Sequence, residues 1–99
     1  MKADRLDDAA IDAALAGLGG WSRDGDVLVR TVRCAGWRAA IRLIDAVADE
    51  ADRHNHHPDS ALTGYRNVTF RLTTHSEGGI THRDVDLARE IEELVPHAS

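Results

Sequence analysis

The sequence GWRAAIRLIDAVADEADRHNHHP spans residues 36–58 and combines the clearest helix pattern of the chain with a cluster of histidines. Over residues 36–53 the apolar positions recur every three or four residues, which predicts a helix with one buried stripe: Trp37, Ala40, Ile41, Ile44, Val47, Ala48 and Ala51. Pro58 disfavours helical geometry at the residue before it, so the helix is expected to stop here. The imidazoles are then displayed where the helix gives way to the next strand.

Shorter elements precede this helix. A helix is predicted over residues 7–18, capped by Asp7. Two strands, Trp21–Arg23 and Val27–Val32, flank the tight-turn sequence Asp24-Gly25-Asp26 and predict a hairpin. The alternation in the second strand does not decide which of its faces is buried.

A further pair of strands and a last helix follow the histidines. Residues 59–64 are expected to form an edge strand or a loop, and a stronger strand is expected to begin at Tyr65 and to end at His75. Its inward face comprises Val68, Phe70, Leu72 and Thr74. Thr81 and Asp84 have the spacing of a capping box, and Pro96 ends the helix that they start. The buried face of this helix is predicted to comprise Val85, Ala88, Ile91, Leu94 and Val95.

The element order is therefore α-β-β-α-β-β-α in a single domain over residues 1–99. Paired strands separated by helices indicate an α+β two-layer sandwich, with a four-stranded antiparallel sheet and three helices on one face. The opposite face of the sheet must be wet, covered by a ligand or buried in an oligomer.

Composition excludes several classes of function. The net charge of −5 argues against binding to a nucleic-acid backbone. No apolar run approaches the roughly 20 residues that cross a membrane, and the start of the chain, from Met1 to Arg5, lacks the apolar region of a secretory signal. Cys34 is the single cysteine, so no intrachain disulfide can form, which fits the cytoplasm. Cys34 itself is expected to be a small buried or half-buried residue.

Three interpretations compete for His54, His56, His57 and His75. The residue patterns of the common zinc sites are absent, and adjacent histidines in an extended segment point to opposite sides, which disfavours a metal site. Exposed histidines at a helix terminus can also be purely structural. The third interpretation is acid/base catalysis, because an imidazole exchanges protons near neutral pH.

A larger ordered set of residues resembles the signature of the pterin-4a-carbinolamine dehydratase family. The set runs from about residue 6 to residue 95 and comprises Gly20-Trp21, Asp52, His56-His57-Pro58, Tyr65, Thr74-His75, Gly79-Ile80-Thr81 and Asp84. Two departures stand out. Six residues separate Pro58 from Tyr65 where the family usually has five, which implies a bulge or longer loop. The often acidic cap before the central helix is replaced by Cys34-Ala35-Gly36.

The resemblance implies dehydration of a 4a-hydroxytetrahydropterin to the quinonoid dihydropterin, without a metal or redox cofactor, in tetrahydrobiopterin recycling. It implies that the catalytic residues are His56, His57 and His75. Contacts to the pterin are expected from Pro58, Thr74, Trp21, Asp52 and Asp84, with core packing as the alternative role of Trp21 and helix capping as that of Asp84. Which histidine is acid and which is base stays open.

The family resemblance also implies partners. A homo-oligomer, either dimer or tetramer, is expected, and an aromatic amino acid hydroxylase is the pathway partner that the resemblance suggests. The alternative function is a non-catalytic protein-binding or assembly module on the same fold, which would not need the histidines.

Overall fold

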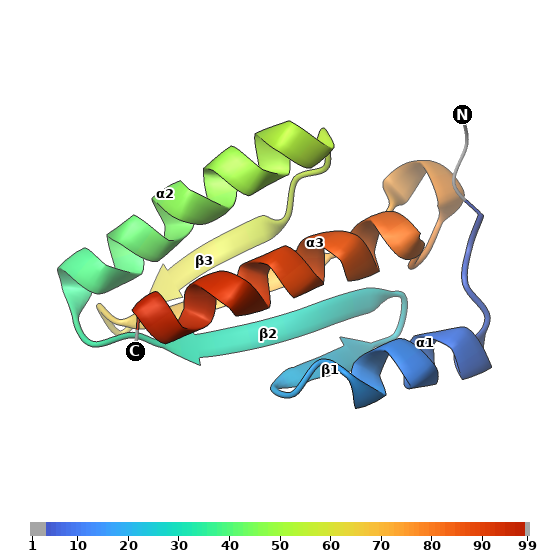
Figure 1. The fold of residues 1–99 in the computed structure, drawn as a ribbon, viewed down its shortest axis with the longest axis horizontal. Coiled ribbons are helices and arrows are strands. Elements are labelled where there is room, and N and C mark those ends of the chain that lie inside the picture. The colour runs from blue at the N-terminus through green and yellow to red at the C-terminus, as the bar shows by residue number, and fades with distance from the viewer. Residues whose placement is uncertain (1–3, 99) are drawn as a thin grey trace.

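A four-stranded antiparallel sheet in the order β1-β2-β4-β3 forms one layer of this computed structural model, which describes residues 4–98 (Figure 1). The strands are β1 (Trp21–Asp24), β2 (Val27–Arg33), β3 (Asp59–Thr63) and β4 (Asn67–Leu72). Leu28 lies opposite Leu72 and Val32 opposite Val68, which aligns the apolar residues of the two central strands on one face. This register decides the burial of β2, since Leu28 and Val32 are buried while Thr31 on the other face is exposed.

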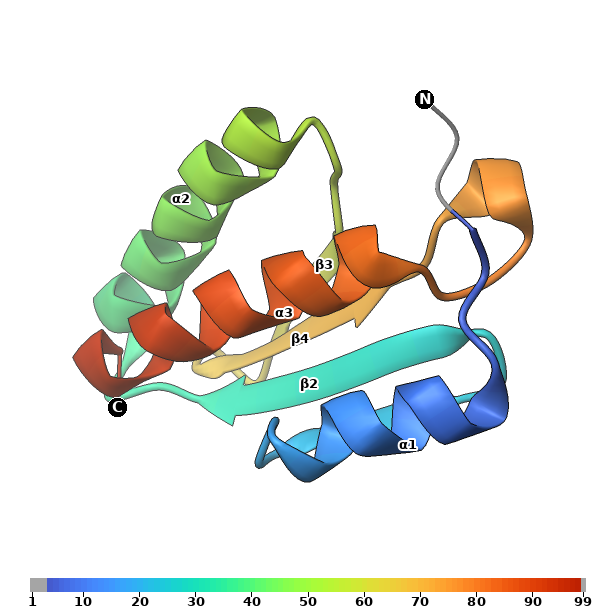
Figure 2. The same cartoon turned by 45° about the vertical axis from the view of Figure 1, so that its right-hand side comes forward.

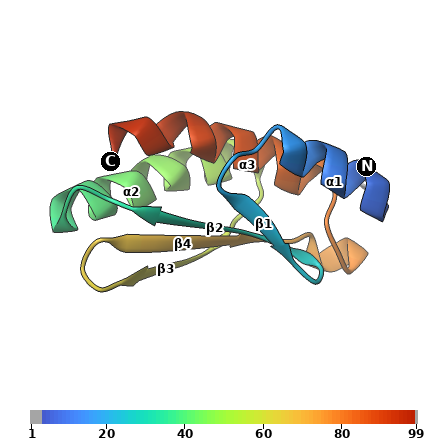
Figure 3. The ribbon, with the colours of Figure 1, turned by 90° about the horizontal axis from the view of Figure 1, so that it is seen from below.

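The second layer consists of α1 (Asp8–Ala16), α2 (Trp37–His54) and α3 (His82–Leu94), all on the same face of the sheet (Figure 3). Figure 2 shows α2 and α3 passing over the strands, with α1 beside β1 and β2. Two short 3₁₀ helices, η1 (His75–Glu77) and η2 (Val95–His97), follow β4 and α3. The predicted order α-β-β-α-β-β-α and the two-layer sandwich are confirmed.

The core lies between these layers and is mostly aliphatic. Phe70, Leu72, Leu87 and Ile91 are fully buried in it, and Cys34 is buried at its edge, as expected. The opposite face of the sheet is polar: the Thr31 and Thr69 hydroxyls lie 2.9 Å apart across β2 and β4, and Arg71 forms an ion pair with Asp24.

The predicted buried stripe of α2 is wrong at three positions. Trp37 and Ile41 are 53% and 42% exposed, and Ala48 is also exposed, whereas Leu43 is buried. Apolar residues occupy more than one side of this helix, and periodicity does not say which side meets the sheet. In α3 the missed core residue is Leu87, while Leu94 is only partly buried.

The predicted start of the fourth strand at Tyr65 is also wrong. Gly64 and Tyr65 both have left-handed backbone angles, with φ of 54° and 57°, and form the β3–β4 turn, where Tyr65 is 60% exposed. The strand ends at Leu72, so His75 begins η1 and does not close a strand.

No helix among residues 4–98 is both long and apolar enough to cross a membrane. The predicted single domain includes residues 1–3 and 99, which lie outside the described residues. Residues 1–3 also make up most of the Met1 to Arg5 segment that is expected to lack the apolar region of a secretory signal.

Candidate active site

A cavity of about 300 Å³ opens where α2 ends, β4 ends and α3 begins. One wall comes from the connection between α2 and β3, the second from the segment that joins β4 to η1, and the third from the first turn of α3. Its lining residues are Asn55, His56, His57, Thr73, Thr74, His75, Ser76 and Arg83. The three histidines predicted to be catalytic therefore share one cavity.

The end of α2 places the two adjacent histidines in different environments. Asn55 ends the helix in the left-handed conformation, with φ 48° and ψ 45°, a geometry that asparagine accepts more readily than most residues. The His56 amide then donates to the Ala51 carbonyl at 3.0 Å. The His56 residue is only 9% exposed, whereas the His57 side chain is 60% exposed. The helix thus ends at His54, four residues before Pro58, and its cap turns the imidazole of His56 inward.

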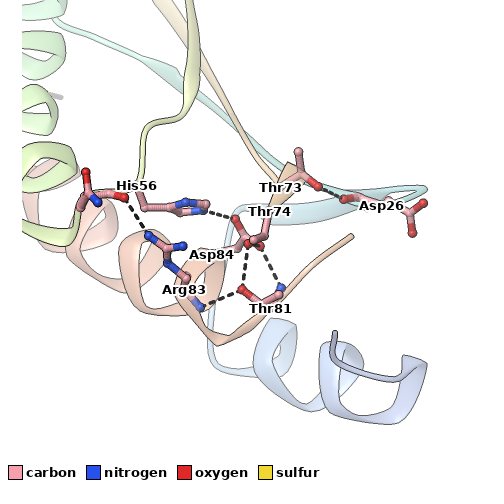
Figure 4. Close-up of polar contacts among 8 residues, drawn as sticks. Asp26, His56, Thr73, Thr74, Thr81, Arg83 and Asp84 are labelled. Atoms are coloured by element: carbon pink, nitrogen blue, oxygen red, sulfur yellow. Dashed lines mark hydrogen bonds and ion pairs between the residues drawn. The ribbon is translucent and has the colours of Figure 1, made fainter. Parts of the chain in front are cut away.

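Asp84 holds the His56 imidazole from below (Figure 4). Its Oδ1 lies 2.5 Å from His56 Nε2, and its Oδ2 accepts from the Thr81 amide and the Thr74 hydroxyl, each at 2.8 Å. Asp84 has no exposed surface. The capping box predicted from Thr81 and Asp84 is confirmed, and the same carboxylate also binds the histidine.

The protons in this network can be assigned from its donors. The Thr74 hydroxyl donates to Asp84, so in the 2.8 Å contact between the two threonine hydroxyls Thr81 donates to Thr74. Thr81 Oγ1 in turn accepts from the Arg83 amide at 3.2 Å. With two donors already on Oδ2, Asp84 acts as an accepting carboxylate, and His56 Nε2 carries the donated hydrogen. The remaining ring nitrogen of His56, Nδ1, then carries the lone pair in the neutral imidazole.

The other two histidines are more accessible. His57 Nε2 lies 3.0 Å from Asp52 Oδ1, and both side chains are largely exposed. His75 is exposed in η1, on the wall formed by the β4–η1 segment. The Thr73 hydroxyl donates to the Asp26 carbonyl at 2.7 Å, which ties this wall to the β1–β2 turn (Figure 4).

Of the five predicted contact residues, Thr74 lines the cavity, whereas Asp84 is fully buried and Asp52 pairs with His57 without lining the cavity. The other two lie elsewhere. Pro58 lines a separate hollow of about 150 Å³ together with His57. Trp21 is 7% exposed in the core, and its indole donates to Glu92 Oε1 at 2.7 Å. The placement of Trp21 agrees with its alternative role in packing. The β3–β4 turn with Tyr65 lies at the far end of the hairpin from the cavity, because β3 and β4 pair from Thr63 opposite Asn67 to Asp59 opposite Arg71.

Sequence reasoning missed four residues of this cavity: Asn55, Thr73, Ser76 and Arg83. Arg83 Nη2 donates to the Asn55 carbonyl at 2.7 Å. A signal existed for Arg83, since a cation in the first turn of a helix opposes the helix dipole and calls for a compensating contact. Within residues 4–98 no group of three or more histidine, cysteine, aspartate or glutamate side chains is arranged to hold a metal ion.

Comparison with known proteins identifies one family, which is also the family that the sequence resembles. Residues 4–94 match the pterin 4 alpha carbinolamine dehydratase family. A relative from Nocardia farcinica, described provisionally as a pterin-4-alpha-carbinolamine dehydratase, is 50% identical over 95% of this chain and 98% of its own length. A Mycobacterium sp. (strain JLS) relative with the same description is 47% identical over 91% and 95%.

A solved structure is also similar. The transcriptional coactivator/pterin dehydratase from Brucella melitensis superposes with a TM-score of 0.88 at 28% identity. The superposition covers 93% of this chain and 99% of the Brucella chain.

Proposed function

We propose, from the premise that this chain belongs to the pterin 4 alpha carbinolamine dehydratase family, that it dehydrates a 4a-hydroxytetrahydropterin to the quinonoid dihydropterin and water. In this reaction the bond between C4a and the hydroxyl oxygen breaks, and the oxygen takes up a proton to leave as water. The N5 proton is lost, and a double bond forms between C4a and N5. Each well-placed proton transfer can contribute roughly 10²–10⁴-fold to the rate.

His56 is the proton-transfer group that its surroundings fix most firmly. Asp84 orients the ring through Nε2, so that Nδ1 is the nitrogen that exchanges a proton with the substrate. Thr74 and the Thr81 amide hold the carboxylate in place, so the orientation of the imidazole exists before substrate binds.

His57 and His75 supply the second proton transfer from the other parts of the cavity wall. His57 is oriented by Asp52, while His75 approaches from the β4–η1 segment, so a planar ring between them meets imidazoles from two elements. One of these histidines and His56 divide the roles of acid at the hydroxyl and base at N5. The observation that carries this proposal is the His56 imidazole, which lines a cavity shared with His57 and His75 and is held by the buried Asp84.

The test follows the absorbance of enzymatically generated 4a-hydroxytetrahydropterin with no protein, the wild type, His56→Ala and His75→Ala. All samples contain a chelator. His97→Ala is the matched control, because His97 is exposed in η2 and does not line the cavity. We expect decay that is accelerated by the wild type and the control and returns toward the buffer rate in the two site variants. Decay no faster than in buffer, from folded wild-type protein, would overturn the dehydratase proposal.

We propose tetrahydrobiopterin recycling as the pathway, with an aromatic amino acid hydroxylase that forms the hydroxylated pterin, because the family resemblance implies both. No observation on the cavity favours the non-catalytic alternative. A binding module would not require a buried carboxylate that fixes one ring nitrogen of a histidine.

Homo-oligomer formation through α2 is the second part of the proposal. The exposed side of this helix carries Trp37 and Ile41. Arg38 and Arg42 lie in its first half, Asp45 at its middle, and Asp49 and Asp52 in its second half, which also holds Arg53. Two antiparallel copies would place Arg38 and Arg42 against Asp49 and Asp52. Sedimentation of the wild type and of Ile41→Glu tests this, with a smaller species expected for the variant. An unchanged sedimentation coefficient would count against α2 as the interface.

A further inference from the structure

The positive charge of Arg83 lies at an electrostatically unfavourable position in α3, which suggests that its side chain has a function. It is the second residue of α3, where the positive end of the helix dipole repels a cation. Its backbone amide already takes part in the helix cap through Thr81. Its side chain lines the cavity and carries the only permanent positive charge among the eight described lining residues.

The guanidinium contacts one defined atom. Nη2 of Arg83 donates to the Asn55 carbonyl at 2.7 Å, across 28 residues of sequence. That carbonyl belongs to the peptide that joins Asn55 to His56, in the left-handed cap of α2. The cap has its own hydrogen bonds, from the Asn55 amide to Asp52 and from the His56 amide to Ala51, but none of these involves α3.

Neighbouring residues of α3 therefore hold the same histidine at two points. Asp84 binds the imidazole at Nε2, and Arg83 binds the carbonyl that immediately precedes the His56 backbone. Two anchors on adjacent residues define both the position of the backbone and the orientation of the ring. With the ring anchor alone, the cap of α2 could shift and move Nδ1 relative to the substrate.

We propose that Arg83 is a positioning residue that fixes His56 through the Asn55 carbonyl. The proposal rests on the dehydratase function for its catalytic consequence, but the anchoring itself is a property of the fold and can be measured separately. The contact to the Asn55 carbonyl uses a single donor, so a lysine of suitable reach can replace Arg83 in part, whereas a neutral glutamine lacks the charge that strengthens the hydrogen bond.

The experiment compares Arg83→Gln, Arg83→Lys and the control Arg89→Gln. Arg89 lies on the same helix, is exposed and pairs with Asp86 away from the cavity. Amide hydrogen exchange of Asn55 and His56 reports on the anchoring, and kcat and KM report on catalysis. For Arg83→Gln we expect about tenfold faster exchange at these two amides and a kcat lowered by roughly 10- to 100-fold with little change in KM. Arg83→Lys should restore most of the wild-type amide protection and most of the wild-type kcat. Arg89→Gln should change neither the exchange rate nor kcat.

Unchanged exchange in Arg83→Gln would overturn the proposal, whatever happens to the rate. In particular, a raised KM with normal exchange would mean that Arg83 contacts the substrate directly. Failure of the proposed function looks different: a wild type without dehydratase activity in which Arg83→Gln still accelerates exchange at Asn55 and His56 would refute the reaction and support the anchoring.

Discussion

The two ends of α3 each present a carboxylate to residues distant in sequence, but the partners differ in kind. At the first end, Asp84 is fully buried and accepts from an imidazole, a hydroxyl and a backbone amide. Near the other end, Glu92 is 25% exposed at its side chain and accepts from the Trp21 indole at 2.7 Å and from Arg30 Nε at 2.6 Å.

The two sets of donors differ in whether the donor group can also take up a proton. An imidazole that donates through one nitrogen retains a second nitrogen that can take up a proton, whereas an indole and a guanidinium are donors only. A carboxylate of α3 accepts hydrogen bonds from other elements in both places. At Asp84 this arrangement supports proton transfer, and at Glu92 it supports packing. We expect substitutions at the two ends to separate activity from stability.

The largest effect is expected for Asp84→Asn. The amide keeps the shape of the side chain but introduces a donor where three donors already point, so the His56 ring loses its partner at Nε2 or turns over. The dehydration rate should fall by roughly 10²–10⁴-fold. The measurement is the decay of the hydroxylated pterin, with circular dichroism to verify the fold. A variant that retains the wild-type rate would show that the two carboxylates play equivalent structural roles.

Gly20→Ala tests the Glu92 end through its backbone. Gly20 has φ of 88°, and a Cβ there would lie 2.6 Å from Arg30 Cζ, whose guanidinium is held by Glu92. The left-handed angle alone costs about 1–2 kcal/mol for a residue with a side chain. We expect a lower free energy of unfolding in urea and an unchanged kcat for the folded fraction. Wild-type stability would mean that Arg30 moves aside freely.

A smaller effect is expected for Glu92→Gln. The amide oxygen can still accept from one donor, so the loss should be about 1 kcal/mol of unfolding free energy, within the range for hydrogen bonds to charged groups after allowance for the exposure of Glu92. The pterin assay should give the wild-type rate. A fall in rate comparable with that of Asp84→Asn would contradict the assignment of catalysis to the Asp84 end and of packing to the Glu92 end.

The smallest effect on stability is expected from Cys34, a buried residue that contacts neither Asp84 nor Glu92. Burial raises the pKa of the Cys34 thiol, and the nearby Arg66 partly opposes this by lowering it. The thiol therefore loses its proton at a lower pH in the unfolded chain than in the folded protein. Stability should decrease slightly as the pH rises through the ordinary thiol range. Alkylation of the native protein at neutral pH should be slow compared with that of urea-unfolded protein. Equal rates would contradict this.

Local patterns in the sequence predicted the elements of the fold and part of the site. The Asp24-Gly25-Asp26 turn, the capping box of Thr81 and the histidine cluster are encoded within a few residues each, and all three are found in the structure. The inward-facing strand residues Val68, Phe70 and Leu72 are buried, as their alternation predicts.

What could not be predicted depends on contacts between elements. Leu43 and Ile41 are equally apolar, and only the packing of α2 on the sheet makes the first buried and the second exposed. Tyr65 favours strands by propensity, yet the turn imposes a left-handed angle on it. The bond from Arg83 to Asn55 joins residues whose spacing carries no signal, because it exists only when α2 ends above the start of α3.

The sequence distances spanned by the two carboxylates bear on the order in which the chain folds. The contact of His56 with Asp84 closes 28 residues, whereas the contacts of Glu92 with Arg30 and Trp21 close 62 and 71. Loop-closure entropy makes the longest of these about 0.8 kcal/mol costlier to close than the shortest. The segment from α2 to α3 therefore contains every element of the cavity and can assemble before the amino-terminal hairpin docks. In a folding experiment, mutations around His56 should slow refolding, while mutations around Trp21 should mainly accelerate unfolding.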